Sequence, residues 1–277
     1  MSEILRFFLL QIGLISIVLV LHTYLGLHII RRTLVFSDLA LDQLAALGAL
    51  IGIALGVSYG TPASYLLSLV AVLFGAFLLA VLKPHRRTVP REAVIGIIYA
   101  LTLIISIMLT DKLPGGDALL TKTFSGIMSW VSGSLVAVTG LVYLALLIFH
   151  IVFRRQFIAL VENPDAVHRE KWWDFLFFTT QGIITVLIVP IAGVFLAYVF
   201  LMIPAAIAAL FTRKWLAAVL LGWSIGLVAC IIGLSSSFYF DWPYCPSMVL
   251  CLGLCFVVAV IVRIILNHRM NPKKESH

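Results

Sequence analysis

Two carboxylates near the start of a long apolar run are the side chains of this sequence best placed to bind a cation. Asp38 and Asp42 are four residues apart, so in a helix both side chains project from one face. Two oxygen donors on one face can hold a divalent cation transiently, which suits a path that the ion must leave again. The alternative is a structural role, in which Asp38 caps the helix start and accepts hydrogen bonds from free backbone N–H groups.

Histidine and cysteine side chains are further candidates. His22 lies well inside the first apolar run and His28 lies near its end, although a histidine in a membrane more often packs through a hydrogen bond than binds a metal. Cys251 and Cys255 share one face of the last run; thiolates suit copper(I) or zinc, but a buried cysteine commonly packs as a small apolar residue. The predicted transient metal path comprises Asp38, Asp42 and His22.

These residues belong to a chain that consists mostly of long apolar runs. Of its 277 residues, 62% are hydrophobic and 11% are charged, and the mean hydropathy is +1.14. A bilayer crossing needs about 20 apolar residues, so we predict an all-α, polytopic transmembrane helical bundle of about eight or nine spans. Pro190 and Gly193 separate two of them, which form either a hairpin or one broken helix. The expected spans are 7–30, 38–58, 62–83, 93–110, 126–153, 174–190, 193–212, 215–238 and 247–266.

Positive charge is distributed unequally between the gaps. Of the 19 Lys and Arg residues, all but Arg6, Lys112 and Lys122 lie in gaps on one alternating side of the runs. This asymmetry predicts that the basic gaps and the C-terminus are cytoplasmic and that, with nine crossings, the N-terminus is outside. The net charge of +7 then indicates contact with anionic lipid rather than with nucleic acid. The outer loops are short, so we expect a single transmembrane domain over 1–277.

One polar segment, residues 154–173, interrupts the apolar runs on the basic side. It is expected to contain a short helix, Gln156–Glu162, that ends before Pro164. A cytoplasmic helix with an apolar face and charged flanks is typical of an element that docks on a partner protein. The alternative is an interfacial helix lying on lipid, with Trp172 and Trp173 as anchors. The docking residues would be Phe157, Leu160, Val161 and Glu162.

Two further patterns limit what the chain can do. Gly48, Gly52 and Gly56 are spaced by four residues, which favours close helix contact within the bundle; lining a transport path or a dimer seam is the alternative. The sequence has no GxxxxGK[ST], HExxH, GxSxG or CxxC motif. We therefore expect no enzymatic activity and no cofactor on this chain, and we expect the energy for uphill transport to come from a partner.

Five stretches carry a resemblance to a known family. They are RRTLVFSDLALDQLAALGALIGIALG (31–56), REAVIGIIYALTLIISIML (91–109), SGIMSWVSGS (125–134), IAGVFLAYVFLMIPAAIAALF (191–211) and SSSFYFDWPYCPSMVLC (235–251). In this order they resemble the inner-membrane permeases of ABC importers for zinc, manganese and iron. The fourth stretch matches the family's signature at Gly193, Pro204, Ala205 and Ala206. The chain departs from the family at Asp42, which stands where the family has histidine, and in the loop Asp111–Lys122, which lacks histidine.

The resemblance implies a permease subunit of a bacterial ABC importer in the inner membrane. It implies ATP-driven alternating access powered by a separate ATPase subunit, an extracytoplasmic metal-binding protein as second partner, and a homodimer. It places the coupling element at residues 154–173 and an outer mouth at Ser237, Tyr239, Asp241 and Pro243. The alternatives are a stand-alone channel or secondary carrier, an ABC permease for a non-metal substrate, and an assembly protein that transports nothing.

Overall fold

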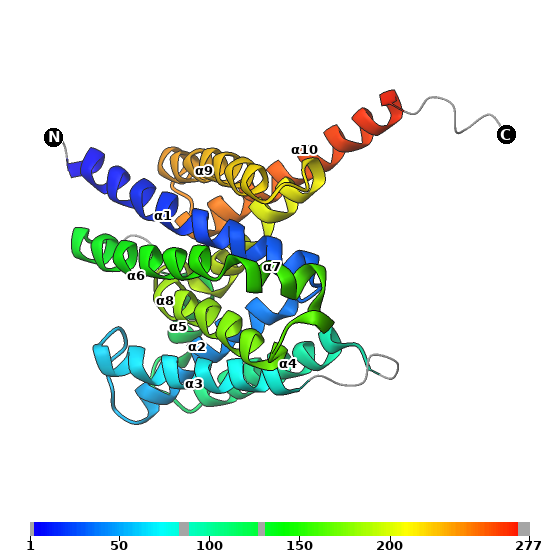
Figure 1. The fold of residues 1–277 in the computed structure, drawn as a ribbon. Helices are drawn as coiled ribbons and strands as arrows, with labels where there is room; N and C mark the ends of the chain where they lie inside the picture. The colour runs from blue at the N-terminus through cyan, green and yellow to red at the C-terminus, as the bar shows by residue number, and fades with distance from the viewer. Residues whose placement is uncertain (1–2, 83–88, 127–130, 271–277) are drawn as a thin grey trace.

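The computed structural model describes residues 3–82, 89–126 and 131–270, and its regular elements in these ranges are all helices (Figure 1). Eight of them are long and apolar enough to cross a bilayer. This confirms the predicted class of an all-α, polytopic bundle. The helices are α1 (Glu3–Arg31), α2 (Phe36–Ala54), α3 (Pro62–Val81), α4 (Arg91–Thr110), α5 (Gly116–Ser125), α6 (Gly133–Val152), α7 (Arg154–Glu162), a 3₁₀ turn (Pro164–Ala166), α8 (Glu170–Phe211), α9 (Trp215–Phe240) and α10 (Tyr244–Met270).

The chain reverses direction inside α8. A straight helix of its 42 residues would be about 60 Å long. Yet Asp174, near its start, pairs with Arg32, and the carbonyl of Arg213, just past its end, accepts a hydrogen bond from Arg31 at 3.0 Å. Because Arg31 and Arg32 are neighbours, both ends of α8 lie at the same end of the bundle. The helix therefore forms the hairpin that the sequence allowed.

Gly193 makes this reversal. Its φ of 75° and ψ of 166° lie in a region that is essentially restricted to glycine. The turn packs on α5, because a Cβ at Gly193 would overlap the carbonyl oxygen of Phe124 and lie 2.5 Å from the amide nitrogen of Gly126. The rings of Phe124 and Phe195 stack beside it at 5.1 Å between centroids.

We expect Gly193→Ala to destabilise the protein by about 1–3 kcal/mol from backbone strain alone, and by more once the contact with Phe124 is included. The matched control is Gly253→Ala in α10, where a Cβ meets nothing within 4 Å and a helical alanine is favoured. Thermal unfolding of both variants in detergent measures the difference. Equal melting temperatures for the two variants would contradict the strain at Gly193.

Basic residues from three connections meet at one end of the bundle, which we call the basic end. Arg31 ends α1 and Arg32 follows it, Arg91 begins α4, and Arg213 follows α8. The opposite end holds the N-terminus of α1, and the C-terminal part of α10 extends towards the basic end (Figure 1). The clustering of basic residues predicted from the sequence is therefore present in three dimensions.

Close packing accounts for part of the glycine pattern in α2. A Cβ at Gly48 would lie 2.7 Å from the carbonyl oxygen of Leu67, so α2 and α3 approach closely there, and one at Gly52 would lie 3.0 Å from the Leu67 side chain. Gly56 is different. The helix ends at Ala54, and Gly56 has a φ of +82° with nothing near its Cβ position, so the prediction of one shared face holds for two of the three glycines.

Two predicted boundaries were wrong. The outer loop expected between the spans 93–110 and 126–153 contains the ten-residue helix α5, which starts after the left-handed Gly115 and rests on α8. The span expected at 126–153 begins at Gly133 instead, because Ser132 caps α6 by accepting a hydrogen bond from the amide of Leu135. Residues 127–130 of that predicted span lie outside the described part of the chain.

Candidate functional site

Two polar pairs join α2 to the first half of α8 inside the bundle. The side-chain amide of Gln181 donates to Asp38 at 2.7 Å, and the hydroxyl of Thr185 donates to Asp42 at 2.9 Å. All four residues are buried, and both pairs repeat at a spacing of four residues, so they form a ladder along one helix contact. We call Asp38, Asp42, Gln181 and Thr185 the polar seam. Asp38 does not cap α2, which begins at Phe36 without a side-chain cap.

Unpaired oxygen atoms make the polar seam suitable for a cation. Among the described residues, Oδ2 of Asp42 and Oε1 of Gln181 are buried and have no hydrogen-bond partner. Burying two carboxylates in an apolar bundle is costly unless a cation or a proton offsets their charge. Carboxylate, amide and hydroxyl oxygens are the ligands preferred by hard divalent cations. The seam can thus hold such an ion briefly between α2 and α8.

His22 is buried in the core and packs against Tyr143 of α6. Its Nδ1 is 3.1 Å from the carbonyl oxygen of Val18 and 3.5 Å from the Tyr143 hydroxyl, and the two rings are stacked. In the described ranges, no group of three or more His, Cys, Asp or Glu side chains is arranged to hold a metal ion. The structure therefore brings Asp38 and Asp42 together as a pair and does not add His22 to a three-ligand set.

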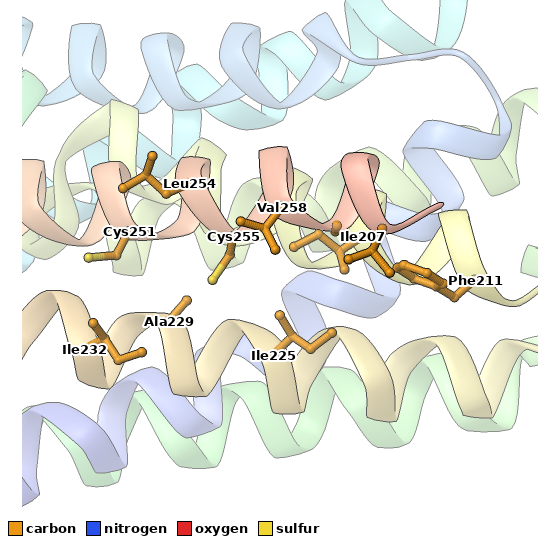
Figure 2. A pocket seen from close by; sticks show the side chains of 11 residues that line it. Ile207, Phe211, Ile225, Ala229, Ile232, Cys251, Leu254, Cys255 and Val258 are labelled. Carbon is orange, nitrogen blue, oxygen red and sulfur yellow. The ribbon is translucent and has the colours of Figure 1, made fainter. Parts of the chain in front are cut away.

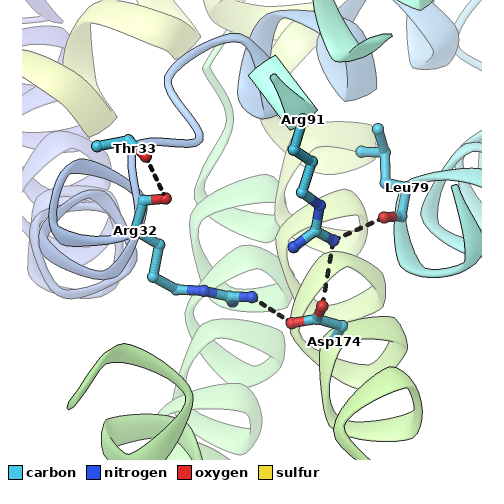
Figure 3. A network of polar contacts seen from close by, with 5 residues as sticks. All are labelled: Arg32, Thr33, Leu79, Arg91 and Asp174. Atoms are coloured by element: carbon cyan, nitrogen blue, oxygen red, sulfur yellow. Dashed lines mark hydrogen bonds and ion pairs between the residues drawn. The ribbon is translucent and has the colours of Figure 1, made fainter. Parts of the chain in front are cut away.

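A buried carboxylate organises the basic end. Asp174 is 0% exposed and pairs through Oδ1 with Arg32 and through Oδ2 with Arg91, at 3.1 Å (Figure 3). Arg91 also donates to the carbonyl oxygen of Leu79 at 2.7 Å. This basic-end network joins the segment after α1, the end of α3 and the starts of α4 and α8. Removing one member of such a buried network leaves the other charges uncompensated.

The network and the polar seam are carried by the same face of α8. Asp174, Gln181 and Thr185 are seven and then four residues apart, which places all three on one side of a helix. A displacement of the start of α8 would therefore move the partners of Asp38 and Asp42. These three residues were not among the predicted site residues, although polar side chains at helical spacing in an apolar run were a visible signal.

The short helix α7 exists as predicted, but its apolar face points inward. Phe157 is 0% exposed and Leu160 is 2% exposed. The ring of Phe157 lies 4.3 Å from that of His150 and 5.7 Å from that of Trp173, measured between centroids. Substitution of either apolar residue would disrupt this chain's own core. Val161 is half-buried, and the outward surface of α7 is charged, with Arg154, Arg155 and Glu162 exposed.

The signature motif is a packing element in this structure. Pro204 and Ala205 are buried, Ala206 is half-buried, and Gly193 forms the reversal described above. A Cβ at Gly222 would lie 2.6 Å from the carbonyl oxygen of Pro204, so α9 approaches the second half of α8 at backbone contact. The motif holds α8 and α9 together and provides no cation ligand itself.

The predicted outer mouth lies at the opposite end from the basic end. Tyr239, Asp241 and Pro243 are exposed there, whereas Ser237 is buried and donates to the carbonyl oxygen of Trp242 at 2.5 Å. Ser237 thus closes the turn between α9 and α10 and does not face outward.

A cavity of about 640 Å³ opens at this same end, beside the α8 reversal. Tyr59, Tyr65, Lys122 and Pro190 are among its lining residues. The ammonium group of Lys122 lies 4.9 Å from the centroid of the Tyr59 ring, and burial, followed by the neighbouring Tyr65, raises the pKa of Tyr59 to about 12. Tyr59 is therefore neutral at physiological pH and offers its ring face to the lysine.

Comparisons with known proteins agree with this arrangement. A family model described as "ABC 3 transport family" matches residues 3–263. A Chlamydia pneumoniae protein described as a "probable metal transport system membrane protein" is 25% identical over 258 residues, which cover 91% of this chain and 86% of that protein. A Chlamydia muridarum protein of the same description is 24% identical over 186 residues, 66% of this chain and 62% of its own length.

The fold has a counterpart among solved structures. A chain of PsaBC from Streptococcus pneumoniae in complex with Fab matches with a TM-score of 0.75 and 19% sequence identity. The match covers 93% of this chain and 91% of that chain, so nearly the whole bundle is shared.

Proposed function

Because this chain belongs to the ABC 3 transport family, whose model matches residues 3–263, we propose that it is the permease subunit of a bacterial importer driven by a separate ATPase. The family match confirms the resemblance seen in five sequence stretches. The chain is a multi-pass membrane protein of a transporter family, and its role is transport rather than covalent chemistry.

The basic end faces the cytoplasm of the inner membrane in this proposal. Arg31, Arg32, Arg91 and Arg213 gather there, and basic residues are retained on the cytoplasmic side during insertion. The N-terminus is then outside and the C-terminus inside, after nine crossings that include both halves of α8. The outer cavity and the turn with Tyr239, Asp241 and Pro243 face an extracytoplasmic binding protein.

The cargo is a divalent metal ion, and the observation that carries this proposal is the polar seam. Two buried carboxylates, Asp38 and Asp42, stand beside unpaired oxygen atoms within a transmembrane bundle. Charged side chains at such depth mark ion pathways. The seam offers few ligands, and no group of three His, Cys, Asp or Glu side chains in the described residues is arranged to hold a metal. Weak coordination suits an ion in transit, because a tight binding site would trap it. Zinc, manganese and iron(II) are the candidates.

Coupling to ATP runs through α7 and α8. The charged outward face of α7 docks on the ATPase, while Phe157 and Leu160 fix the helix to the bundle. ATP binding in the partner moves α7 and the start of α8, and α8 carries the partners of Asp38 and Asp42. Two copies of the chain, each with one ATPase, thus alternate access to a central path.

We expect Arg155→Glu to lower ATP-driven uptake several-fold, because it reverses a charge on the docking face. Folding stability should stay within about 0.5 kcal/mol, since Arg155 is exposed. The matched contrast is Phe157→Asp, which places a charge in the core and should prevent folding. Co-purification of the ATPase, metal uptake and melting temperature are measured on each variant. Normal uptake by both Arg155→Glu and Glu162→Lys would exclude this face as the docking surface.

The function itself is tested in proteoliposomes. The chain is reconstituted with its ATPase and binding protein, and uptake of zinc, manganese and iron(II) is measured separately with ATP or ADP inside. We expect ATP-dependent uptake of at least one metal and no flux through the chain alone. Flux without ATP would support a channel or secondary carrier instead, and a complex that hydrolyses ATP without moving any of the three metals would point to a non-metal substrate.

A further inference from the structure

An apolar groove runs along the outside of the bundle between α9 and α10. It has a volume of about 420 Å³, and its lining includes Ile225 and Ile232 of α9 and Phe211 at the end of α8 (Figure 2). On the α10 side the thiols of Cys251 and Cys255 point into the space between the helices. Leu254 and Val258 border it and are more than half exposed. The groove therefore opens sideways at membrane depth.

The groove ends among basic residues. Phe211 and Val262 both line it, and the adjoining residues are Arg213 and Lys214 after α8 and Arg263 on α10. Arg213 and Lys214 are exposed, and none of the three makes an ion pair within the described residues. The sequence has no Asp or Glu from 175 to 240 or from 242 to 274, so no acid from these stretches neutralises them.

Backbone groups add to the positive potential at this place. Helix α9 begins at Trp215, and its preceding residue, Lys214, gives no side-chain cap. The first amide groups of the helix are therefore free to bind an anion, and the helix dipole favours negative charge there. An apolar groove of membrane depth thus leads directly to a cluster of cationic side chains and free amides.

We propose that this groove binds an anionic phospholipid. One acyl chain lies along Ile225, Ile232 and Cys255, and the phosphate group rests against Arg213, Lys214 and the start of α9. The charges favour a lipid over a second copy of the chain, because two copies meeting at this groove would bring like-charged clusters together. Anionic lipids are attracted by basic residues at the membrane surface, and the groove supplies the apolar half of the contact.

The site also touches the transport machinery. Ile207 and Phe211, which line the groove, follow the signature residues Pro204, Ala205 and Ala206 on the same helix. Buried glycines hold α9 against Pro204, and α10 packs on both α8 and α9. A lipid chain in the groove therefore fills the outer boundary of the packed α8–α9 contact. The lipid is expected to stabilise the folded chain.

Thiol labelling tests the proposal on the full-length chain in detergent. Cys230, Cys245 and Cys251 are changed to alanine, so that Cys255 is the remaining thiol, and its reaction rate with N-ethylmaleimide is measured. Added dioleoylphosphatidylglycerol should slow labelling about tenfold or more relative to the same amount of dioleoylphosphatidylcholine. The double variant Arg213→Ala with Lys214→Ala should lose this preference. The matched control, Arg154→Ala with Arg155→Ala, removes two basic residues outside the groove and should keep it.

Two outcomes would overturn the proposal. Equal protection by both lipids, unchanged in the Arg213 and Lys214 variant, would mean that the groove takes up hydrocarbon without recognising a headgroup. Protection that increases with protein concentration in the absence of lipid would mean that a second copy of the chain covers the groove. Melting temperatures of the same samples separate lipid binding from unfolding, because a variant that unfolds would label faster in every lipid.

Discussion

Replacing Asp174 by asparagine is expected to cost about 3–5 kcal/mol of folding stability. The carboxylate is completely buried and pairs with both Arg32 and Arg91, whose side chains are 7% and 20% exposed. Without it, two positive charges remain close together in a poorly solvated place. The expected result is a large drop in melting temperature and loss of uptake, measured on purified protein and in proteoliposomes.

A surface ion pair of the same chain provides the matched control. Asp111 and Lys112 are 3.0 Å apart, with side chains that are 71% and 79% exposed. Asp111→Asn should therefore change stability by about 0–1 kcal/mol. Removal of both partners in Asp174→Asn with Arg91→Met should recover part of the loss, because one uncompensated charge is removed. If Asp174→Asn is as stable as Asp111→Asn, the basic-end network does not hold α1, α4 and α8 together.

The second large effect is expected at the polar seam. Asp42→Asn should lower metal uptake about tenfold or more, because a charged ligand contributes about 1.5–3 kcal/mol to a polar contact. Asparagine has the same shape, and its oxygen can still accept the hydrogen bond from Thr185, which now lies 2.9 Å from the carboxylate. Burying a neutral amide costs less than burying a carboxylate. We therefore expect stability to be kept or slightly raised while transport is lost.

A transport role for Asp42 predicts that uptake falls while stability is kept or slightly raised. A structural role predicts that both fall. Asp42→Glu keeps the charge and should retain part of the uptake, whereas Thr185→Val removes only the hydrogen-bond donor and should have a smaller effect than Asp42→Asn. ATP hydrolysis by the complex is measured in parallel, since a defect in docking would lower it. Unchanged uptake in Asp42→Asn would remove the polar seam from the translocation path.

The class of fold and the position of most helices were predictable from the sequence. Apolar runs such as 62–83 and 215–238 correspond to α3 and α9 because hydrocarbon forces each segment to satisfy its own backbone hydrogen bonds in a helix. The pairing of Asp38 with Asp42 on one face was also predictable, since it depends only on helical periodicity. Helix α5 was not predictable, because its short and polar sequence GDALLTKTFS lacks an apolar run of span length.

The partners of the candidate site were not predictable in this way. Gln181 lies 143 residues from Asp38 in sequence, and nothing in either helix alone indicates that they meet. Phe157 was expected to face a partner protein because its helix is amphipathic, yet the fold covers that face with Trp173 and His150. An apolar face must be buried, but periodicity does not say against which surface.

The residues of this chain determined by themselves that it crosses a membrane as helices, with its basic segments on one side, because these properties depend on local hydropathy and charge. The tertiary structure alone decided that α8 turns back at Gly193, that Asp174 joins Arg32 to Arg91, and that α8 supplies the partners of Asp38 and Asp42. These are contacts between distant segments, and they are fixed by how helices pack side by side once lipid has already determined that they are helices.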